Sequence, residues 1–167
     1  MNSAIRRATM RRAVATIGTA FVCALALLPS SEIPQSASGC ASLNAVAFRE
    51  YVDYATMIQP IFDSACVRCH ARGRSFLDLS SGQSAASLIG VPSAQDPALI
   101  RVVPRSPTQS LLRGKVQCVL PGVGARMPLD ALPLSLVQQA LIYDWIVAGA
   151  PLDSGQRIFV SGFESRP

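Results

Sequence analysis

The stretch Cys66-Val67-Arg68-Cys69-His70 decides the fold expected for this chain. Two thiols with two residues between them, followed at once by a histidine, are the attachment signature of a c-type haem. On one helical turn Cys66 and Cys69 share a face, so both sulfurs can add to the two vinyl groups along one porphyrin edge. The imidazole of His70 can then bind the iron from the proximal side. The stretch predicts one haem c, bound covalently through Cys66 and Cys69.

Two other kinds of site use the same pair of cysteines. A structural zinc site needs four ligands, usually from a second Cys/His pair, and beyond the N-terminal segment only Cys40 and Cys118 remain. A thioredoxin-like redox pair follows a strand in a βαβ unit, and nothing before Cys66 has the pattern of such a strand. Haem is therefore the preferred interpretation, with zinc and a redox pair as alternatives.

The N-terminus has the pattern of a secretory signal. Residues 1–12 hold four arginines and no acid, and the fifteen residues from Val14 to Leu28 are uncharged and mostly apolar. A membrane span needs roughly 20 apolar residues, so an uncleaved anchor is the alternative. We expect residues 1–39 to be signal peptide and linker, and the protein to be periplasmic or otherwise exported from a bacterium. Haem c is attached outside the cytoplasmic membrane, which agrees with export.

Cys40 has two competing interpretations. The run Ala37-Ser38-Gly39-Cys40 resembles a bacterial lipobox, but Ala37 stands where Leu is usual, and the run lies far beyond the apolar segment. The rival is a disulfide with Cys118, which an oxidising compartment permits. We expect membrane attachment only if Cys40 is lipidated or the N-terminal segment stays uncleaved.

Composition describes a small, loop-rich domain. The formal charge of the chain is +5, and residues 1–40 supply +3 of it through four arginines and Glu32, which leaves +2. Two haem propionates would bring the remainder near neutrality, so the charge gives no argument for nucleic acid. With 12 prolines and 11 glycines, we expect a single domain whose core is largely the haem.

Short helices are expected between the loops, on apolar spacing and on residues that begin or end helices. They lie at 44–54, with Phe48, Tyr51 and Val52 on one side; from Pro60 through the cysteines to Gly73; at 84–89; over 110–113, opened by Pro107 or Thr108; and at 136–148, capped by Ser135 and stopped by Gly149.

Several short motifs, in order along residues 57–152, resemble one family. The chain is similar to class I c-type cytochromes, in particular to the planctomycete-type cytochrome c domains of secreted bacterial proteins. Besides Cys66 to His70, the matching runs are Ile58-Gln59-Pro60-Ile61-Phe62, Leu77-Asp78-Leu79-Ser80, Val103-Pro104 with Pro107, Ser110-Leu111-Leu112, Lys115-Val116, Met127-Pro128-Leu129, Asp144-Trp145-Ile146 and Gly149-Ala150.

The resemblance implies an all-α, loop-rich, small class I cytochrome c fold, with three to five short helices around one covalently bound haem. The last helix would pack across the first, with Trp145 at the crossing. Arg105 departs from the family pattern, which usually has Gly there, and this leaves the conformation of the local turn open. Residues 40–56 would form a lead-in, 57–152 the cytochrome c domain and 153–167 a tail with a short strand at 157–160, to which we assign no function.

The sixth iron ligand follows by elimination. His70 is the single histidine, which leaves a methionine, Lys115 or an open position. Met57 leads into the proximal helix and is awkwardly placed to reach the other face. Met127 follows His70 by 57 residues, enough to wrap the haem, in a glycine-containing loop that Pro128 stiffens. Met127 is the predicted ligand, and its alternative is a gap-filling core side chain.

The function expected from these features is electron transfer by a monohaem carrier with His/Met-ligated iron. Redox proteins would dock at the haem edge through small, transient interfaces. No catalytic constellation is present in the sequence. The alternatives are a gas sensor or haem enzyme module with an open sixth position, and a structural haem domain of a larger complex. One of Arg101, Arg105, Arg113, Lys115 and Arg126 is expected to pair with a haem propionate.

Overall fold

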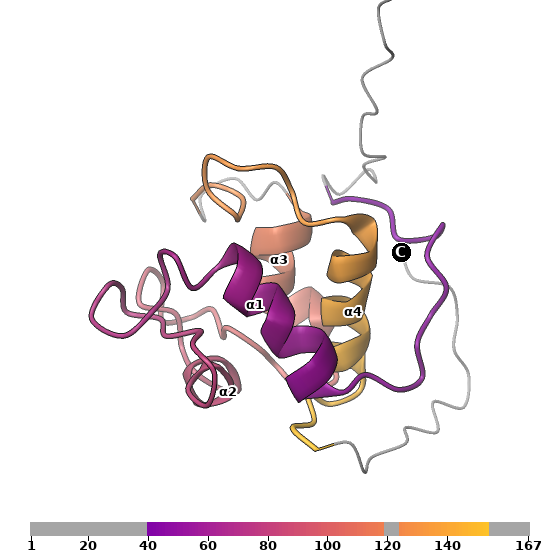
Figure 1. Cartoon of the computed structure of the whole chain (residues 1–167), viewed down its shortest axis with the longest axis horizontal. Coiled ribbons are helices and arrows are strands. Elements are labelled where there is room, and N and C mark those ends of the chain that lie inside the picture. The colour runs from indigo at the N-terminus through magenta and orange to yellow at the C-terminus, as the bar shows by residue number, and fades with distance from the viewer. Residues whose placement is uncertain (1–39, 119–123, 154–167) are drawn as a thin grey trace, which may run out of the picture. The chain divides into compact units, whose positions relative to one another are not determined.

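The computed structural model describes residues 40–118 and 124–153. The predicted signal peptide, part of the glycine-containing loop and most of the predicted tail, including its short strand, lie outside these residues. Among the described residues, no helix has the length and apolarity to cross a membrane. The helices are η1 (Tyr54–Ile58), α1 (Gln59–Ala65), α2 (Ser84–Leu88), η2 (Pro107–Gln109), α3 (Leu111–Gln117) and α4 (Leu136–Val147) (Figure 1).

The first helical segment begins ten residues later than the sequence predicted. Asp53 caps it, because its carboxylate accepts hydrogen bonds from the backbone N–H and the hydroxyl of Thr56 at 2.7 and 2.6 Å. The π-helix η1 then continues directly into α1, where Pro60 occupies the first turn. Proline suits that place because its missing N–H has no helical partner there.

The expected helix at 44–54 is wrong for all but its last residue. Leu43 and Val46 pack instead against Ala140 and Tyr143 of α4 while their own backbone is not helical. The backbone N–H of Arg49 donates to the buried carboxylate of Asp144 at 3.0 Å. Contacts with α4 therefore determine the conformation of this segment, and they override its local helical spacing.

Helix α4 forms as the sequence predicted. Ser135 caps it, and the side chain of Gln138 bonds back to the Ser135 N–H, which completes a capping box. Gly149 follows the end of the helix with φ 95°, a left-handed conformation that glycine adopts without strain. Buried side chains occupy most of the helix, and the helix packs against η1 and α3.

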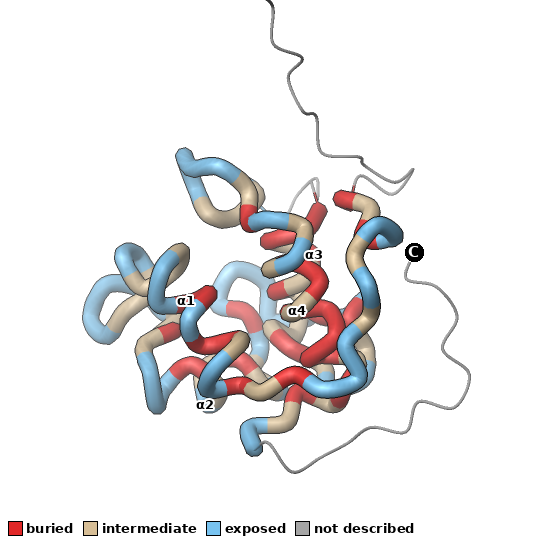
Figure 2. The backbone as a smooth tube through the Cα atoms, turned by 45° about the vertical axis from the view of Figure 1, so that its right-hand side comes forward, coloured by how far each residue is buried: buried red, intermediate tan, exposed pale blue. Residues whose placement is uncertain are grey.

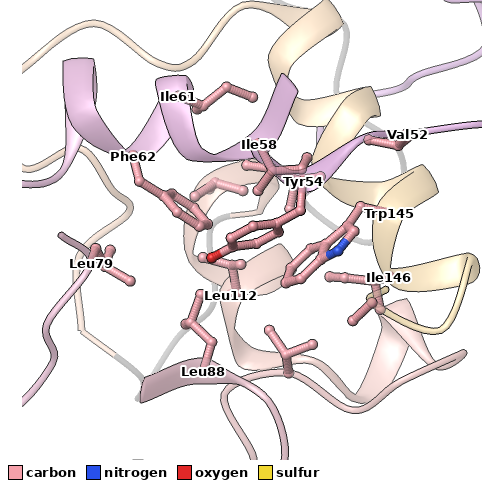
Figure 3. Packing of buried hydrophobic residues seen from close by; sticks show 14 of the residues in the cluster. Val52, Tyr54, Ile58, Ile61, Phe62, Leu79, Leu88, Leu112, Trp145 and Ile146 are labelled. Atoms are coloured by element: carbon pink, nitrogen blue, oxygen red, sulfur yellow. The ribbon is translucent and has the colours of Figure 1, made fainter. Parts of the chain in front are cut away.

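Trp145 lies where α4 meets η1. Its ring is fully buried, its centroid lies 5.2 Å from that of Tyr54, and its indole N–H donates to the Pro151 carbonyl at 2.9 Å. Tyr54 also meets Phe62 of α1 edge-on, with the centroids 6.5 Å apart. Figure 3 shows these three rings in one layer of the core. The aromatic residues thus join the first and last helices, and Figure 2 shows the buried backbone concentrated there.

The segment after Cys40 is tied to the end of α3. Cys40 and Cys118 form a disulfide across 78 positions of sequence. Beside it the Ala41 N–H donates to the Gln117 carbonyl at 2.9 Å, and the Gln117 side-chain amide donates to the Ala41 carbonyl at 2.8 Å. Of the two interpretations of Cys40, the structure has the disulfide, which leaves no thiol there to carry a lipid.

The turn at Arg105 has a backbone conformation that glycine favours, although an arginine occupies it. Arg105 has φ 64°, in the left-handed region that glycine favours. Its N–H donates to the Ile146 carbonyl at 2.8 Å, and its guanidinium lies over Gly149. These contacts with the end of α4 offset the cost of that backbone conformation.

Candidate haem site

The cysteine pair and His70 lie on a turn that continues from α1. The helix ends at Ala65, earlier than the predicted end at Gly73. Its hydrogen bonding extends one turn further, because the N–H groups of Cys69 and His70 both donate to the Cys66 carbonyl, at 3.0 and 2.9 Å. The structure therefore brings Cys66, Cys69 and His70 together on one turn.

The two cysteines differ in surroundings. Cys66 is half-buried and packs against the main core, and this burial raises the pKa of its thiol to about 11. Cys69 is exposed. Both are free thiols, although the chain forms a disulfide elsewhere. Free thiols are the form that adds to haem vinyl groups, and a ring attached here would lie between the core and the surface.

The hydrogen bonds around His70 define its tautomer. Its Nδ1 lies 3.1 Å from the Ser75 hydroxyl oxygen, and that hydroxyl donates its single proton to the Leu77 carbonyl at 2.6 Å. Because a carbonyl can only accept, Ser75 has no proton left for the imidazole and must accept from Nδ1–H. The lone pair of His70 is then on Nε2, available to a metal. Partial burial also lowers the pKa of His70, which favours the neutral, ligating form.

A buried hydrogen-bond chain holds the backbone behind His70. The His70 carbonyl accepts from the Leu79 N–H at 2.8 Å, and the Leu79 carbonyl accepts from the Gln59 amide at 3.0 Å. The amide oxygen of Gln59 in turn accepts from the Ser84 hydroxyl, which leaves Tyr54 to donate to Ser84. This chain links η1, α1 and α2 to the segment that follows the turn.

Sequence reasoning missed both Ser75 and Gln59. The available signals were a serine five residues after the histidine, and a glutamine between two apolar residues of the predicted proximal segment. Gln59 is only 6% exposed, so it is a core residue that the apolar spacing of its neighbours did not identify. Neither residue type has a spacing rule that would assign it to a haem site.

Met127 lies on a separate loop after α3. Its N–H donates to the Lys115 carbonyl at 2.7 Å, and its side chain is half-buried. Gly124, three residues before Met127, has φ 78°, and a Cβ at Gly124 would lie 3.2 Å from Lys115 Nζ. Figures 1 and 2 both draw the loops that contain Met127 and residues 66–80 on the same side of α3 and α4. Met57, the rejected candidate, packs against the main core from η1.

The donor set suits a haem better than a bare metal ion. Within the described ranges, no group of three or more His, Cys, Asp and Glu side chains could hold a metal. The disulfide removes Cys40 and Cys118 from any zinc site. A haem c needs only two thiols, a neutral imidazole and a second axial donor, and Cys66, Cys69, His70 and Met127 are of those types.

Two of the basic residues considered for a propionate have other partners. Arg101 donates to the carbonyls of Ser87 and Phe76, at 2.7 and 3.1 Å. Arg113 donates to Gln117 and lies over the Tyr143 ring, 5.8 Å from its centroid. Pairing with a propionate through Arg105, Lys115 or Arg126 stays a prediction.

The Ser75 interaction predicts the acid stability of the bond that His70 would form with a haem iron. Loss of such a partner typically weakens a metal site ~10- to 100-fold. Because one proton competes with the iron for His70, a tenfold loss of iron affinity raises the pH of the acid transition by about one unit. We therefore expect the pH midpoint at which His70 leaves the iron to be about one unit higher in haem-bearing Ser75→Ala than in the wild-type protein. Absorption spectra during acid titration measure it. Ser64→Ala, which removes a hydroxyl bonded to the Pro60 carbonyl, is the control. Equal transitions in both variants would contradict the assigned role of Ser75.

Comparisons with known proteins give one weak similarity. No protein-family model matches the chain, and no curated protein matches it. Among solved structures, the hydrazine synthase of Kuenenia stuttgartiensis is similar, with 24% identity and a TM-score of 0.43 over 59% of this chain and 16% of that chain. The match spans only a small part of that protein's length.

Proposed function

We propose that the chain is an exported monohaem c-type cytochrome that carries single electrons between redox proteins. The observation that supports this most is the turn from Cys66 to His70. It holds two free thiols and an imidazole whose Nε2 lone pair is available to iron. We further propose Met127 as the second axial ligand and a class I cytochrome c fold, on the motifs that resemble that family.

In this proposal the protein holds and orients the cofactor. Bound haem supplies one-electron redox chemistry. Cys66 and Cys69 fix the ring covalently, and Ser75 and the Gln59 hydrogen bonds keep the proximal turn in one arrangement. Met127 would close the distal side, with its backbone tied to α3. Such restraint favours a carrier, because an iron held by two axial ligands changes oxidation state with little rearrangement.

Carbon monoxide distinguishes this function from the alternative of a sensor or haem enzyme. The full chain, produced in a bacterial host that matures c-type cytochromes, is reduced and titrated with carbon monoxide. A carrier with both axial positions filled should show no spectral change at about micromolar gas, because the Met127 thioether occupies the sixth position. Stoichiometric binding at that level would favour the open-site alternative.

A further inference from the structure

The surface around Cys69 is unusually basic. The described residues hold nine basic and eight acidic side chains, yet Arg68, Arg72 and Arg74 fall within seven positions, and residues 64–77 contain no acid. All three arginines are exposed. A domain of nearly balanced charge therefore concentrates positive charge on one loop, and such a patch acts on the approach of charged molecules.

The loop also presents an aromatic side chain. Phe76 is 89% exposed, the most exposed large apolar side chain among the described residues. Its backbone is held in place, because the Phe76 carbonyl accepts from Arg101 at 3.1 Å. The side chain of Arg74 is also held in place, because its guanidinium donates a hydrogen bond to the Arg68 carbonyl at 3.0 Å. We name Arg68, Arg72, Arg74 and Phe76 the arginine face.

Asp78 is the first acid after this loop in the sequence. Asp78 is half-buried, and its carboxylate accepts from the Ser80 N–H at 3.0 Å. Its pKa is lowered chiefly by the hydrogen bonds from Ser80, and also by the charge of Arg72. Residues 64–77 hold three arginines and no acid, so the face keeps a net positive charge.

We propose that the arginine face docks an electron-transfer protein that presents a cluster of carboxylates, with Phe76 as the central apolar contact. This inference rests on the proposed function. Cys69 is exposed and lies between Arg68 and Arg72 in the sequence, so a haem edge bonded to it would adjoin the docked surface. Guanidinium groups bind carboxylates with two parallel hydrogen bonds, which orients the partner. Charges at the edge of such an interface mainly accelerate association.

A protein partner fits this face better than an anionic membrane. Surface binding to lipid uses a helix with a broad apolar side, whereas this loop is not helical and exposes a single large apolar side chain. The small area matches the weak, transient interfaces of redox proteins. Anionic lipid is therefore the competing occupant in the test.

The first experiment measures electron transfer to small oxidants of opposite charge. One electron passes from the reduced protein to hexacyanoferrate(III), giving hexacyanoferrate(II), or to a cationic cobalt(III) phenanthroline complex, giving cobalt(II). Replacing all three arginines by Gln should slow electron transfer to the anionic oxidant about tenfold at low ionic strength and should accelerate electron transfer to the cationic oxidant. The difference should vanish near 0.5 M salt, where charges are screened. Arg49→Gln, an exposed arginine outside the face, is the control and should change either rate much less.

The second experiment needs no electron transfer. A glutamate-rich peptide of about 20 residues and phosphatidylglycerol vesicles are titrated onto the haem-bearing protein, with the triple Gln variant and Phe76→Ser in parallel. Peptide binding that both variants weaken would support the proposal. Binding to vesicles but not to the peptide would overturn it, as would rates and binding unchanged in the triple variant. If the triple variant shows unchanged rates and binding while the protein carries haem and is redox-active, the docking proposal fails and the proposed function stands. A colourless protein would instead refute the proposed function itself.

Discussion

Replacing Met127 by alanine is expected to abolish the weak charge-transfer band of a Met–Fe(III) bond near ~700 nm. The sulfur of Met127 is the proposed sixth ligand, so the variant has no thioether to supply that transition. The reduction potential should fall as well, because methionine ligation favours Fe(II) over harder donors. Spectra of the oxidised protein and a redox titration measure the two effects.

Met57→Ala is the matched control for this experiment. Met57 is the second methionine of the described residues and is also half-buried, but it packs against the core from η1. Its loss should lower stability and leave the band in place. If the band survives in Met127→Ala, or disappears in Met57→Ala, the ligand assignment is wrong.

Removing the disulfide should cost about 4.5 kcal/mol of unfolding free energy. A crosslink across 78 positions restricts the unfolded chain strongly, and the loop-entropy relation gives this magnitude for a loop of that length. Both cysteines are buried, so the double variant Cys40→Ser, Cys118→Ser also places two hydroxyls in an apolar environment. Urea unfolding of the haem-bearing protein, followed by far-UV circular dichroism, measures the loss.

The wild-type protein with its disulfide reduced provides the control, because it restores chain freedom without adding hydroxyls. Reduction alone should account for most of the loss. Unfolding free energies within about 0.5 kcal/mol of each other for all three forms would contradict the disulfide. Such a result would return lipidation of Cys40 to consideration.

Local signals explain what the sequence predicted well. Ser135 and Gly149 mark the ends of α4, and Pro60 marks the start of α1, because capping and proline effects act within one turn. The joint placement of Cys66, Cys69 and His70 also follows from a five-residue spacing. These features need no knowledge of the rest of the chain.

Contacts between distant segments explain what the sequence did not predict. Residues 44–53 have helical spacing, yet they lie along α4 and bond to Asp144, which is 95 positions away from Arg49. Gln59 is polar but belongs to the core through Leu79 and Ser84. Arg105 occupies a left-handed turn because the end of α4 accepts its N–H. No pattern within one segment reports such partners.

The mass of the mature protein tests the central claim most directly. Purified from a host that matures c-type cytochromes and analysed under denaturing conditions, the protein should be heavier than its processed polypeptide by about 616 Da, one haem joined through two thioethers. Replacing Cys66 and Cys69 together by Ala should remove this increment. A wild-type protein at the bare polypeptide mass, and without colour, would contradict covalent haem and the function proposed from it.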